Sequence, residues 1–271
     1  MSEEARRLIV RYHDETKHHA RRFARSLGYL DWDTQPHPFR SFRDAARVDL
    51  VAPFRAARTA SPRSDPPWMR VDFDEAILAD APTGVGPGLH AVSVFLRYSL
   101  GLSAWKQAGA SRWALRVNPS SGNLHPTEGY VVLGPGTANG QAGVFHYAPD
   151  QHALERRAAF DDATWTAFAD ALPPGAFLAG LASIHWREAW KYGERAFRYC
   201  QHDVGHAIAA MSVAAAMIGW RVRLLPGWSS EGMAAIMGVD RDTDFEGAEP
   251  EEPACLLLVT PGHADDGDVP E

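Results

Sequence analysis

The sequence predicts a protein of the α+β class, and three observations support this prediction. Candidate strands alternate with candidate helices of unequal length, a hairpin signal occurs near the middle of the chain, and no regular βαβ or other internal repeat is visible. The 271 residues are 45% hydrophobic and 23% charged, which is ordinary for a globular protein and excludes a disordered or disulfide-stapled chain. A chain of this length can bury a sizeable core.

The first 88 residues are expected to form a helix followed by a wrapping segment. Ser2 can cap a helix that runs to about Leu27, where Gly28 is a natural stop. Residues 31–68 are rich in proline and aromatic residues and have no sustained helical or strand period, so we interpret them as a segment that lies on other parts of the protein. A short helix is expected around residues 74–79.

Residues 89–262 are expected to form the core of the protein. Apolar residues at helical spacing predict a helix over residues 90–108, which Gly109 ends. Further helices are predicted over residues 161–172, 194–219 (the longest) and 230–237. Strands are predicted over residues 112–117, 129–133, 144–147, 152–156, 182–186, 220–225 and 255–260. Residues 263–271 are expected to form an acidic, mobile tail.

The distribution of charge and cysteine excludes several classes of protein. Residues 1–70 hold 14 Lys and Arg against 9 Asp and Glu, but they lack the dense basic stripe with interleaved aromatics of a nucleic-acid binder. We therefore expect no nucleic-acid partner. Neither a membrane-spanning apolar stretch nor a secretory signal is visible, so no membrane partner is expected. With only Cys200 and Cys255, a cytoplasmic location is expected.

The first candidate for a functional motif is the loop at residues 116–126, RVNPSSGNLHP. Here a predicted strand opens into two prolines, two serine hydroxyls, an asparagine amide and a glycine. The backbone N–H groups and short side chains of such a loop can approach the polar edge of a flat ligand, and Gly122 permits a close approach. Because the same residue types dominate ordinary turns, a plain tight connection is the alternative.

The second candidate motif spans residues 186–199, WREAWKYGERAFRY, where a predicted strand meets the long helix. Lys191 beside Tyr192 offers a base and an acid in adjacent positions. The alternative is an ordinary helix start, with Glu194 favourable to the helix dipole and arginines in ion pairs at i, i+3 spacing.

The third candidate motif is a histidine pair. His202 and His206 share one helix face at i, i+4, as in the H-E-x-x-H zinc site, although Asp203 stands where the catalytic Glu should be. His125, His185 and Glu188 are candidates for a third ligand by residue type only, so no metal is assigned. A metal-dependent hydrolase that uses His202 and His206 therefore remains an alternative function.

The first two motifs together resemble the nitroreductase-like flavoproteins, and among them the SagB/ThcOx-type dehydrogenases. The resemblance covers about residues 90–260. In the first block the matching residues are Arg116, Pro119, Ser120, Gly122, Pro126, Glu128 and Tyr130. In the second block they are Lys191, Tyr192, Gly193, Arg195, Gly205 and His206.

The resemblance implies a nitroreductase-like α+β fold, with a central, mainly antiparallel sheet flanked by helices and a long central helix. It also implies FMN in a pocket at the boundary of a tight homodimer, or between this chain and a second similar unit. The residues that would line the FMN site are Arg116, Pro119, Ser120, Ser121, Gly122 and Asn123. Lys191 and Tyr192 match the catalytic pair that removes a proton while hydride passes to the flavin. The function expected on this basis is an FMN-dependent oxidoreductase acting on a small molecule or a peptide-borne substrate.

The chain departs from the family pattern at the flavin phosphate. Relatives carry an Arg-Arg-Ser-x-Arg run before the first core helix, whereas this chain has no arginine between Val71 and Leu96. Arg221 and Arg223 are the predicted substitutes, and Arg40 and Arg43 are a second possibility. If neither pair serves, the chain is interpreted as a degenerate flavin fold that binds a partner or dimerises without turnover.

Overall fold

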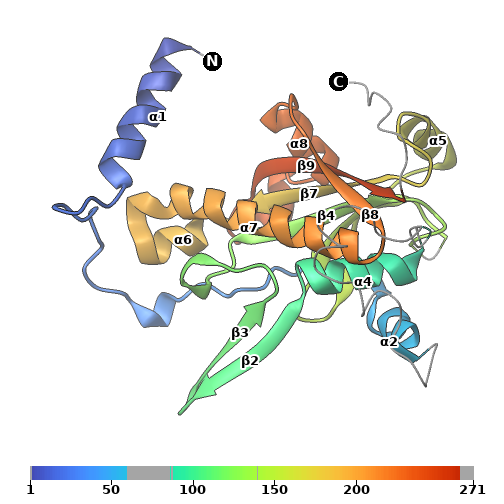
Figure 1. Ribbon diagram of the computed structural model, residues 1–271, viewed down its shortest axis with the longest axis horizontal. Helices are drawn as coiled ribbons and strands as arrows, with labels where there is room; N and C mark the ends of the chain where they lie inside the picture. Colours follow the sequence, from blue (N-terminus) through green and yellow to red (C-terminus); the bar gives the residue numbers. More distant parts are fainter. Residues whose placement is uncertain (1, 60–85, 87, 139, 263–271) are drawn as a thin grey trace.

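The computed structural model describes residues 2–59, 86, 88–138 and 140–262. A seven-stranded antiparallel sheet forms its centre, in the order β1-β6-β5-β4-β7-β9-β8 (Figure 1). The bounds of these strands are β1 Arg47–Asp49, β4 Thr127–Leu133, β5 Gly143–Ala148, β6 Ala153–Ala159, β7 Phe177–Ser183, β8 Trp220–Leu225 and β9 Glu252–Pro261. A separate hairpin pairs β2 Leu102–Ala108 with β3 Ser111–Arg116. The α+β class is therefore confirmed.

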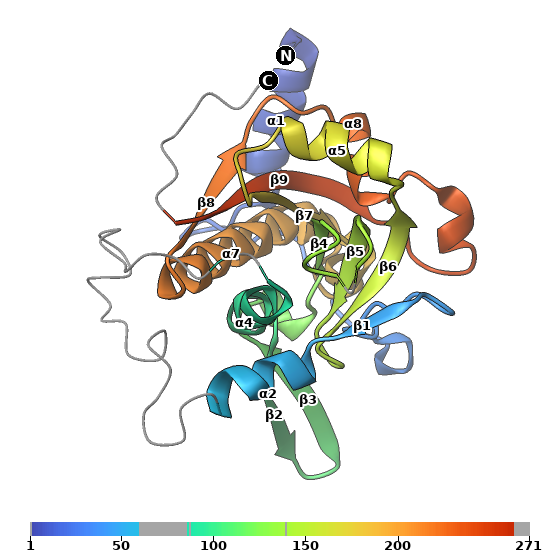
Figure 2. The ribbon, with the colours of Figure 1, turned by 90° about the vertical axis from the view of Figure 1, so that its right-hand side faces the viewer.

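Helices cover both faces of the sheet (Figure 2). On one face lie α4 Leu89–Ser99 and the 22-residue α7 Ala196–Met217, and on the other lie α5 Asp162–Asp170 and α8 Ser230–Met237. The remaining helices are α1 Glu3–Thr16, α2 Val51–Thr59 and α6 His185–Tyr192. Within the described residues, every helix is too short or too polar to span a lipid bilayer.

The sheet has a hydrophobic core on each of its two faces. Successive side chains of a strand point to opposite faces, so neighbouring residues join different cores. In β4 and β7 the odd-numbered residues Val131 and Leu181 pack with α4 and α7, while the even-numbered Val132 and Leu178 pack toward α8. The same period places Thr127 and Ser183, which are directly opposite each other, on the α7 side of the sheet. These two residues mark the end of the sheet at which α6 begins.

The first helix is shorter than the sequence predicts. It ends at Thr16 instead of Leu27, and the chain then runs over the corner between α6 and α7. Tyr12 donates a hydrogen bond to the Glu194 carbonyl at 2.8 Å, and the Trp190 indole donates to the Asp31 carbonyl at 3.1 Å. Arg25 pairs with Glu194 at 2.5 Å and Leu27 packs on Gly193, so contacts with distant residues hold residues 17–27 where local propensity alone predicted more helix.

Two other predicted boundaries are wrong. Helix α4 ends at Ser99, and residues 102–108 form β2 instead of continuing the helix, because their backbone pairs with β3. A Cβ at Gly101 would collide with the Arg97 carbonyl, so the turn between the two elements requires glycine. The strand predicted at residues 182–186 is β7, which lies earlier, so Lys191 and Tyr192 lie on helix α6 and not beside a strand end. The helix predicted at residues 74–79 and the tail at 263–271 lie outside the described residues.

A buried network of charges lies on the α8 side of the sheet. The Glu128 carboxylate bonds to the Arg187 guanidinium of α6 at 2.6 Å and to His146 Nε2 at 3.0 Å. The other nitrogen of His146 faces Glu155 at 3.2 Å. Burial opposes ionisation, yet Arg187, Arg116 and His146 keep the pKa of Glu128 below its ordinary value, so the group is a charged carboxylate.

The same network holds the N-terminal segment against the sheet. The Glu155 carboxylate accepts from the Phe42 backbone N–H at 2.9 Å and pairs with Arg47 at 2.9 Å. Arg40 pairs with buried Glu251 at 3.0 Å, and Glu251 in turn accepts from the Tyr130 hydroxyl at 2.8 Å. Residues 40–47 are thereby fixed, and β1 is added to the edge of the sheet beside β6.

Replacing Glu128 should destabilise the protein strongly. In Glu128→Gln the charges of Arg187, Arg116 and His146 lose their shared buried partner, and we expect unfolding to become easier by about 3–5 kcal/mol. Urea unfolding followed by tryptophan fluorescence measures this. The exposed variant Glu4→Gln should stay within about 0.5 kcal/mol of the parent. A loss of similar size in both variants would contradict a central role for Glu128.

Candidate active site

The loop of residues 118–126 is held in shape by its own polar side chains. Ser120 Oγ accepts from the His125 backbone N–H at 2.8 Å, and the Asn123 amide donates to the Ala114 carbonyl at 2.8 Å. Gly122, Asn123 and His125 all have positive φ angles, of 61°, 61° and 51°. The side chains of Ser120 and Asn123 therefore stabilise an unusual backbone, which leaves Gly122 at the exposed tip.

A buried carboxylate on α7 anchors this loop. Both oxygens of Asp203 accept from the Ser121 backbone N–H, at 3.0 and 3.1 Å, and one also accepts from the Ser121 hydroxyl at 2.8 Å. Hydrogen bonds to an ionised acceptor are about twice as strong as neutral ones. Asp203 thus fixes the middle of the loop to the central helix.

Lys191 and Tyr192 reach the tip of the loop from α6. A Cβ built on Gly122 would lie 2.6 Å from the Tyr192 hydroxyl oxygen and 3.1 Å from Lys191 Nζ. An amine and a phenol therefore meet at a residue that must be glycine. The ring of Tyr192 also lies 4.3 Å from the Tyr199 ring, centroid to centroid, so it is supported from α7. Both side chains are half-buried and remain open to solvent.

Glu188 lies on the same face of α6 as this pair, because residues 188, 191 and 192 have i, i+3 and i+4 spacing. Its side chain is fully buried. Burial, reinforced by the Asp203 carboxylate, raises the pKa of Glu188 to about 9 against the smaller opposing effect of Lys191. Burial and then Glu188 raise the pKa of Tyr192 above its ordinary value, so its phenol is protonated at neutral pH.

The other face of α6 is held by the sheet and by the N-terminal segment. Arg187 bonds to Glu128, and the Trp190 indole also donates to the Thr34 hydroxyl at 3.1 Å. Leu27 packs on Gly193, where an added Cβ would lie 3.1 Å from the leucine side chain. The wrapping segment thus closes over the helix that carries Lys191 and Tyr192.

Of the predicted ligand-binding residues, the structure brings Ser121, Gly122, Lys191 and Tyr192 together. Pro119 is exposed on the same loop. Arg116 is turned away from the tip, because its buried guanidinium donates to the Thr127 and Pro38 carbonyls and lies 3.8 Å from Glu128. Its assignment to a cofactor stays a prediction.

The predicted phosphate ligands Arg221 and Arg223 lie elsewhere, on β8, just after the C-terminal end of α7. Lys191 and Tyr192 lie before its N-terminal end, and a 22-residue helix is about 33 Å long. The other candidate, Arg40, is buried against Glu251 and is already paired. The two predicted parts of the flavin site are therefore far apart within one chain.

The histidine pair gathers no further ligand. His202 and His206 are exposed on α7, and the closest approach to an acid is 4.0 Å, from His206 to Asp203. In the part of the chain that the structure describes, no three His, Cys, Asp or Glu side chains form a group that could hold a metal. Asp203, which the sequence suggested as part of a metal motif, instead anchors the loop.

The structure adds two residues that sequence reasoning did not assign to this site. Asp203 and Glu188 were considered only as components of a metal centre. The signal for Glu188 was present as its i, i+3 and i+4 spacing to Lys191 and Tyr192. Nothing local signals the contact from Asp203 to Ser121, because 82 residues separate the two.

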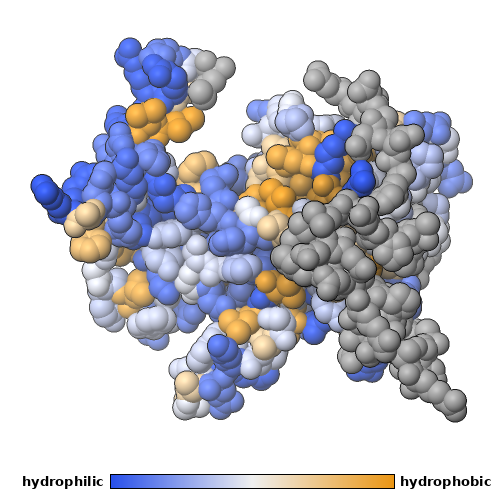
Figure 3. All heavy atoms as spheres, in the orientation of Figure 1, coloured by the Kyte–Doolittle hydropathy of each residue, from blue (hydrophilic) through white to orange (hydrophobic). Residues whose placement is uncertain are grey.

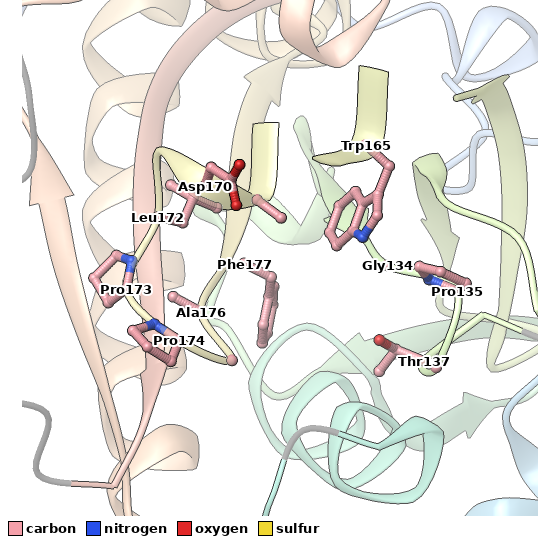
Figure 4. A pocket seen from close by; sticks show the side chains of 13 residues that line it. Gly134, Pro135, Thr137, Trp165, Asp170, Leu172, Pro173, Pro174, Ala176 and Phe177 are labelled. Carbon is pink, nitrogen blue, oxygen red and sulfur yellow. The ribbon is translucent and has the colours of Figure 1, made fainter. Parts of the chain in front are cut away.

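Two cavities were compared with this site. One of about 680 Å³ lies at the opposite end of the sheet, where β4 ends and β7 begins, and Asp170 is its one titratable lining residue (Figure 4). The other, of about 330 Å³, adjoins the loop at Asn123 and is lined by aromatic residues of the N-terminal segment and the hairpin, among them Phe39, Trp105 and Trp113. The described residues that line these two cavities do not include Gly122, Lys191 or Tyr192.

Comparison with known proteins gives consistent matches. A sequence profile of the Nitroreductase family matches residues 106–259. The trifolitoxin-processing protein TfxB of Rhizobium leguminosarum bv. trifolii is 36% identical over 112 residues, which cover 37% of this chain and 29% of TfxB.

Solved structures show the same fold. A protein from Anabaena variabilis described as a nitroreductase aligns with a TM-score of 0.66 at 24% identity, over 93% of this chain and 46% of that one. A chain of the E. coli microcin synthetase McbBCD complex with truncated pro-MccB17 bound aligns with a TM-score of 0.50 at 18% identity, over 98% and 95% of the two chains. The predicted nitroreductase-like fold is confirmed. The chain spans less than half the length of TfxB and of the Anabaena protein.

The titration of Glu188 should make stability depend on pH. Its pKa rises from an ordinary value of about 4.3 when unfolded to about 9 when folded, so folding takes up a proton between these values. Stability is then lost as pH rises from about 5 to 9, by up to about 1.4 kcal/mol per pH unit. Glu188→Gln should remove this slope in urea unfolding measured at pH 5, 7 and 8.5. Exposed Glu231→Gln should leave it unchanged, and an equal slope in parent and Glu188→Gln would contradict the assignment.

Proposed function

Because the chain belongs to the nitroreductase family, whose members are commonly flavin-dependent oxidoreductases, we propose that it is an FMN-dependent oxidoreductase of the SagB/ThcOx type. The observation that carries the proposal is the meeting of Lys191 Nζ and Tyr192 Oη at Gly122. A base, a phenol and an accessible stretch of main chain lie together there. A base within reach of a bound flat redox ring can remove the proton while the ring accepts a hydride.

The 118–126 loop fits the ring of a flavin. Gly122 is exposed, and because Tyr192 and Lys191 fill the space where a side chain would stand, a flat ring would approach its main chain from the other side. Three side chains of the loop form hydrogen bonds within the protein, namely those of Ser120, Ser121 and Asn123. In this proposal these three residues shape the loop, while its main chain and Pro119 form the surface that contacts the ring.

The flavin phosphate requires a second copy of the chain in this proposal. Arg221 and Arg223 lie at the other end of α7 from Lys191, which is farther than one FMN molecule can span. Two copies of α7 packed antiparallel about a two-fold axis would bring the C-terminal end of one to the N-terminal end of the other. The described surface of α7 supports such a contact, because it exposes residues at four-residue spacing: Phe197, Gln201, Gly205, Ala209 and Val213.

In this proposal Lys191 is the base, and Tyr192 is a hydrogen-bond donor to the substrate. When bound, FMN would supply the acceptor for the hydride that the substrate loses. Lys191 Nζ, which acts as the neutral amine in this step, takes the proton from the neighbouring substrate atom, so that a double bond forms in the substrate between the two atoms. Tyr192, whose raised pKa keeps the phenol protonated, donates a hydrogen bond to the substrate. The proton on Lys191 then passes to solvent, to which this half-buried side chain is open.

We propose a ring carried on a peptide, such as an azoline, as the substrate. The likeness to a trifolitoxin-processing protein and to a microcin synthetase chain supports a peptide substrate. Two free, buried cysteines are consistent with a cytoplasmic enzyme.

Removing the base should slow turnover without loss of flavin. In Lys191→Ala we expect a peptide thiazoline to bleach the bound flavin about 10²–10⁴-fold more slowly in anaerobic single turnover, because the proton has no acceptor. Tyr192→Phe should be slowed less. The FMN content of each variant is measured by absorbance.

The matched control is Lys106→Ala, which removes an exposed lysine from the hairpin and should react like the parent. A protein that takes up no FMN would favour the alternative of a degenerate flavin fold without turnover. Normal bleaching in Lys191→Ala would instead disprove the role of Lys191 while leaving the cofactor in place.

Gly205 allows a direct test of the two-fold pairing. An added Cβ there meets no atom within 4 Å in the single chain, so Gly205→Arg should fold normally. At the centre of the exposed α7 face it should weaken the dimer at least about 100-fold, by steric and charge repulsion, and release FMN. Sedimentation velocity and flavin absorbance measure both effects. Gly205→Ala, which raises helix propensity and adds little volume, should remain dimeric; a dimeric, flavin-loaded Gly205→Arg would rule out this interface.

A further inference from the structure

The Glu188 side chain has no hydrogen-bond partner. It is fully buried, and both of its carboxyl oxygens lack a partner among the described residues. The hydroxyls of Thr127 and Ser183, which face each other on the α7 side of the sheet, are also buried and have no partner among the described residues. A buried carboxylate without hydrogen bonds or a counter-ion is very costly, whereas a neutral carboxylic acid is tolerated.

Glu188 and Asp203 are two buried acids that interact, and they differ in how many hydrogen bonds their carboxyl groups accept. Asp203 accepts three hydrogen bonds from Ser121, and each of them favours the charged carboxylate. Glu188 accepts none. When two acids interact, the single negative charge stays on the one that is better solvated. Here that acid is Asp203, the anchor of the loop.

We propose that Glu188 is a positioning residue that must stay protonated: as a neutral acid behind the 118–126 loop, it leaves Asp203 to carry the one negative charge that holds Ser121. When Glu188 ionises, the second negative charge repels Asp203 and attracts Lys191. Ser121 is then held less tightly, and Lys191 Nζ is drawn away from Gly122. The inference rests on the proposed function only in that it identifies this loop as the flavin site.

Among the other described groups that face Glu188, Lys191 favours its ionisation, but less than burial and Asp203 oppose it. From α6 these groups are Lys191 and Tyr192, and from α7 they are Asp203 and Cys200. Burial, then Glu188 and Asp203, raise the pKa of the Cys200 thiol well above its ordinary value, so the thiol stays neutral. His206, beyond Asp203 at 4.0 Å, is exposed. With the pKa of Glu188 at about 9, the loop should loosen in mildly alkaline solution.

The Ser121 amide reports on the anchor directly. We would measure its hydrogen exchange, resolved by residue, in the flavin-free protein at pH 7 and pH 10, for the parent and for Glu188→Gln. At pH 7 the two should agree. At pH 10 about ten Glu188 side chains are ionised for each protonated one, and the parent should exchange faster than Glu188→Gln at the same pH. The Thr164 amide, which exposed Asp161 caps at 2.7 Å, is the internal control and should not differ.

Two further measurements keep the test decisive. Asp203→Asn should lose Ser121 protection at both pH values, because the charged acceptor is gone. In the parent, the infrared absorption of protonated buried carboxyls should decrease between pH 8 and pH 10, and the same decrease in Glu251→Gln would assign it to Glu188, because burial raises the pKa of Glu251 as well. Equal Ser121 exchange in the parent and Glu188→Gln at pH 10, or the absence of that absorption at pH 7, would overturn the proposal. Neither readout needs FMN, so a protein that binds no flavin but behaves in this way would refute only the proposed function.

Discussion

The buried ion pair between Glu128 and Arg187 is the constraint on which the rest of the structure depends. Glu128 belongs to β4, which directly follows the 118–126 loop, and Arg187 lies one turn before Lys191 on α6. Their 2.6 Å contact therefore sets the position of the helix relative to the loop. Such a pair is costly to desolvate, and it is stable here because His146, Arg116 and backbone carbonyls satisfy the remaining polar atoms.

Helix α6 is too short to be stable alone, and its two faces explain why it forms. One face, with Arg187 and Trp190, is bound to the sheet and to the N-terminal segment. The other face presents Glu188, Lys191 and Tyr192 to the loop and to α7. The N-terminal segment that wraps the corner holds this helix in place through Trp190 and Gly193. It covers the back of the helix whose front carries the amine and the phenol.

The buried side and the exposed side of helix α7 have different roles. Its buried side joins the core of the sheet and places Asp203 beneath Ser121, while its exposed side offers a row that ends in Ala209 and Val213. Figure 3 shows a further apolar patch on α1, formed by Leu8, Ile9 and Val10, which are more than half exposed. Exposed apolar surface on two helices of one corner is consistent with the proposed pairing of two copies.

The sequence by itself determined the class of the fold, several complete elements and the two motifs of the site. The strand at residues 220–225 and the helix at 230–237 were predicted with their observed bounds, because the residues that define each element are adjacent in the sequence. The stretches around Gly122 and Lys191 were named as candidates from their residue types, which an ordinary turn and an ordinary helix start also explain, and the resemblance to the nitroreductase-like flavoproteins favoured the functional interpretation. Only the tertiary structure decided that residues 102–108 form a strand, that Lys191 lies on a helix, and that Asp203 and Glu188 stand behind the loop. The physical reason is that strand pairing, burial and the ionisation of a carboxyl depend on neighbours many residues away, which a local pattern does not contain.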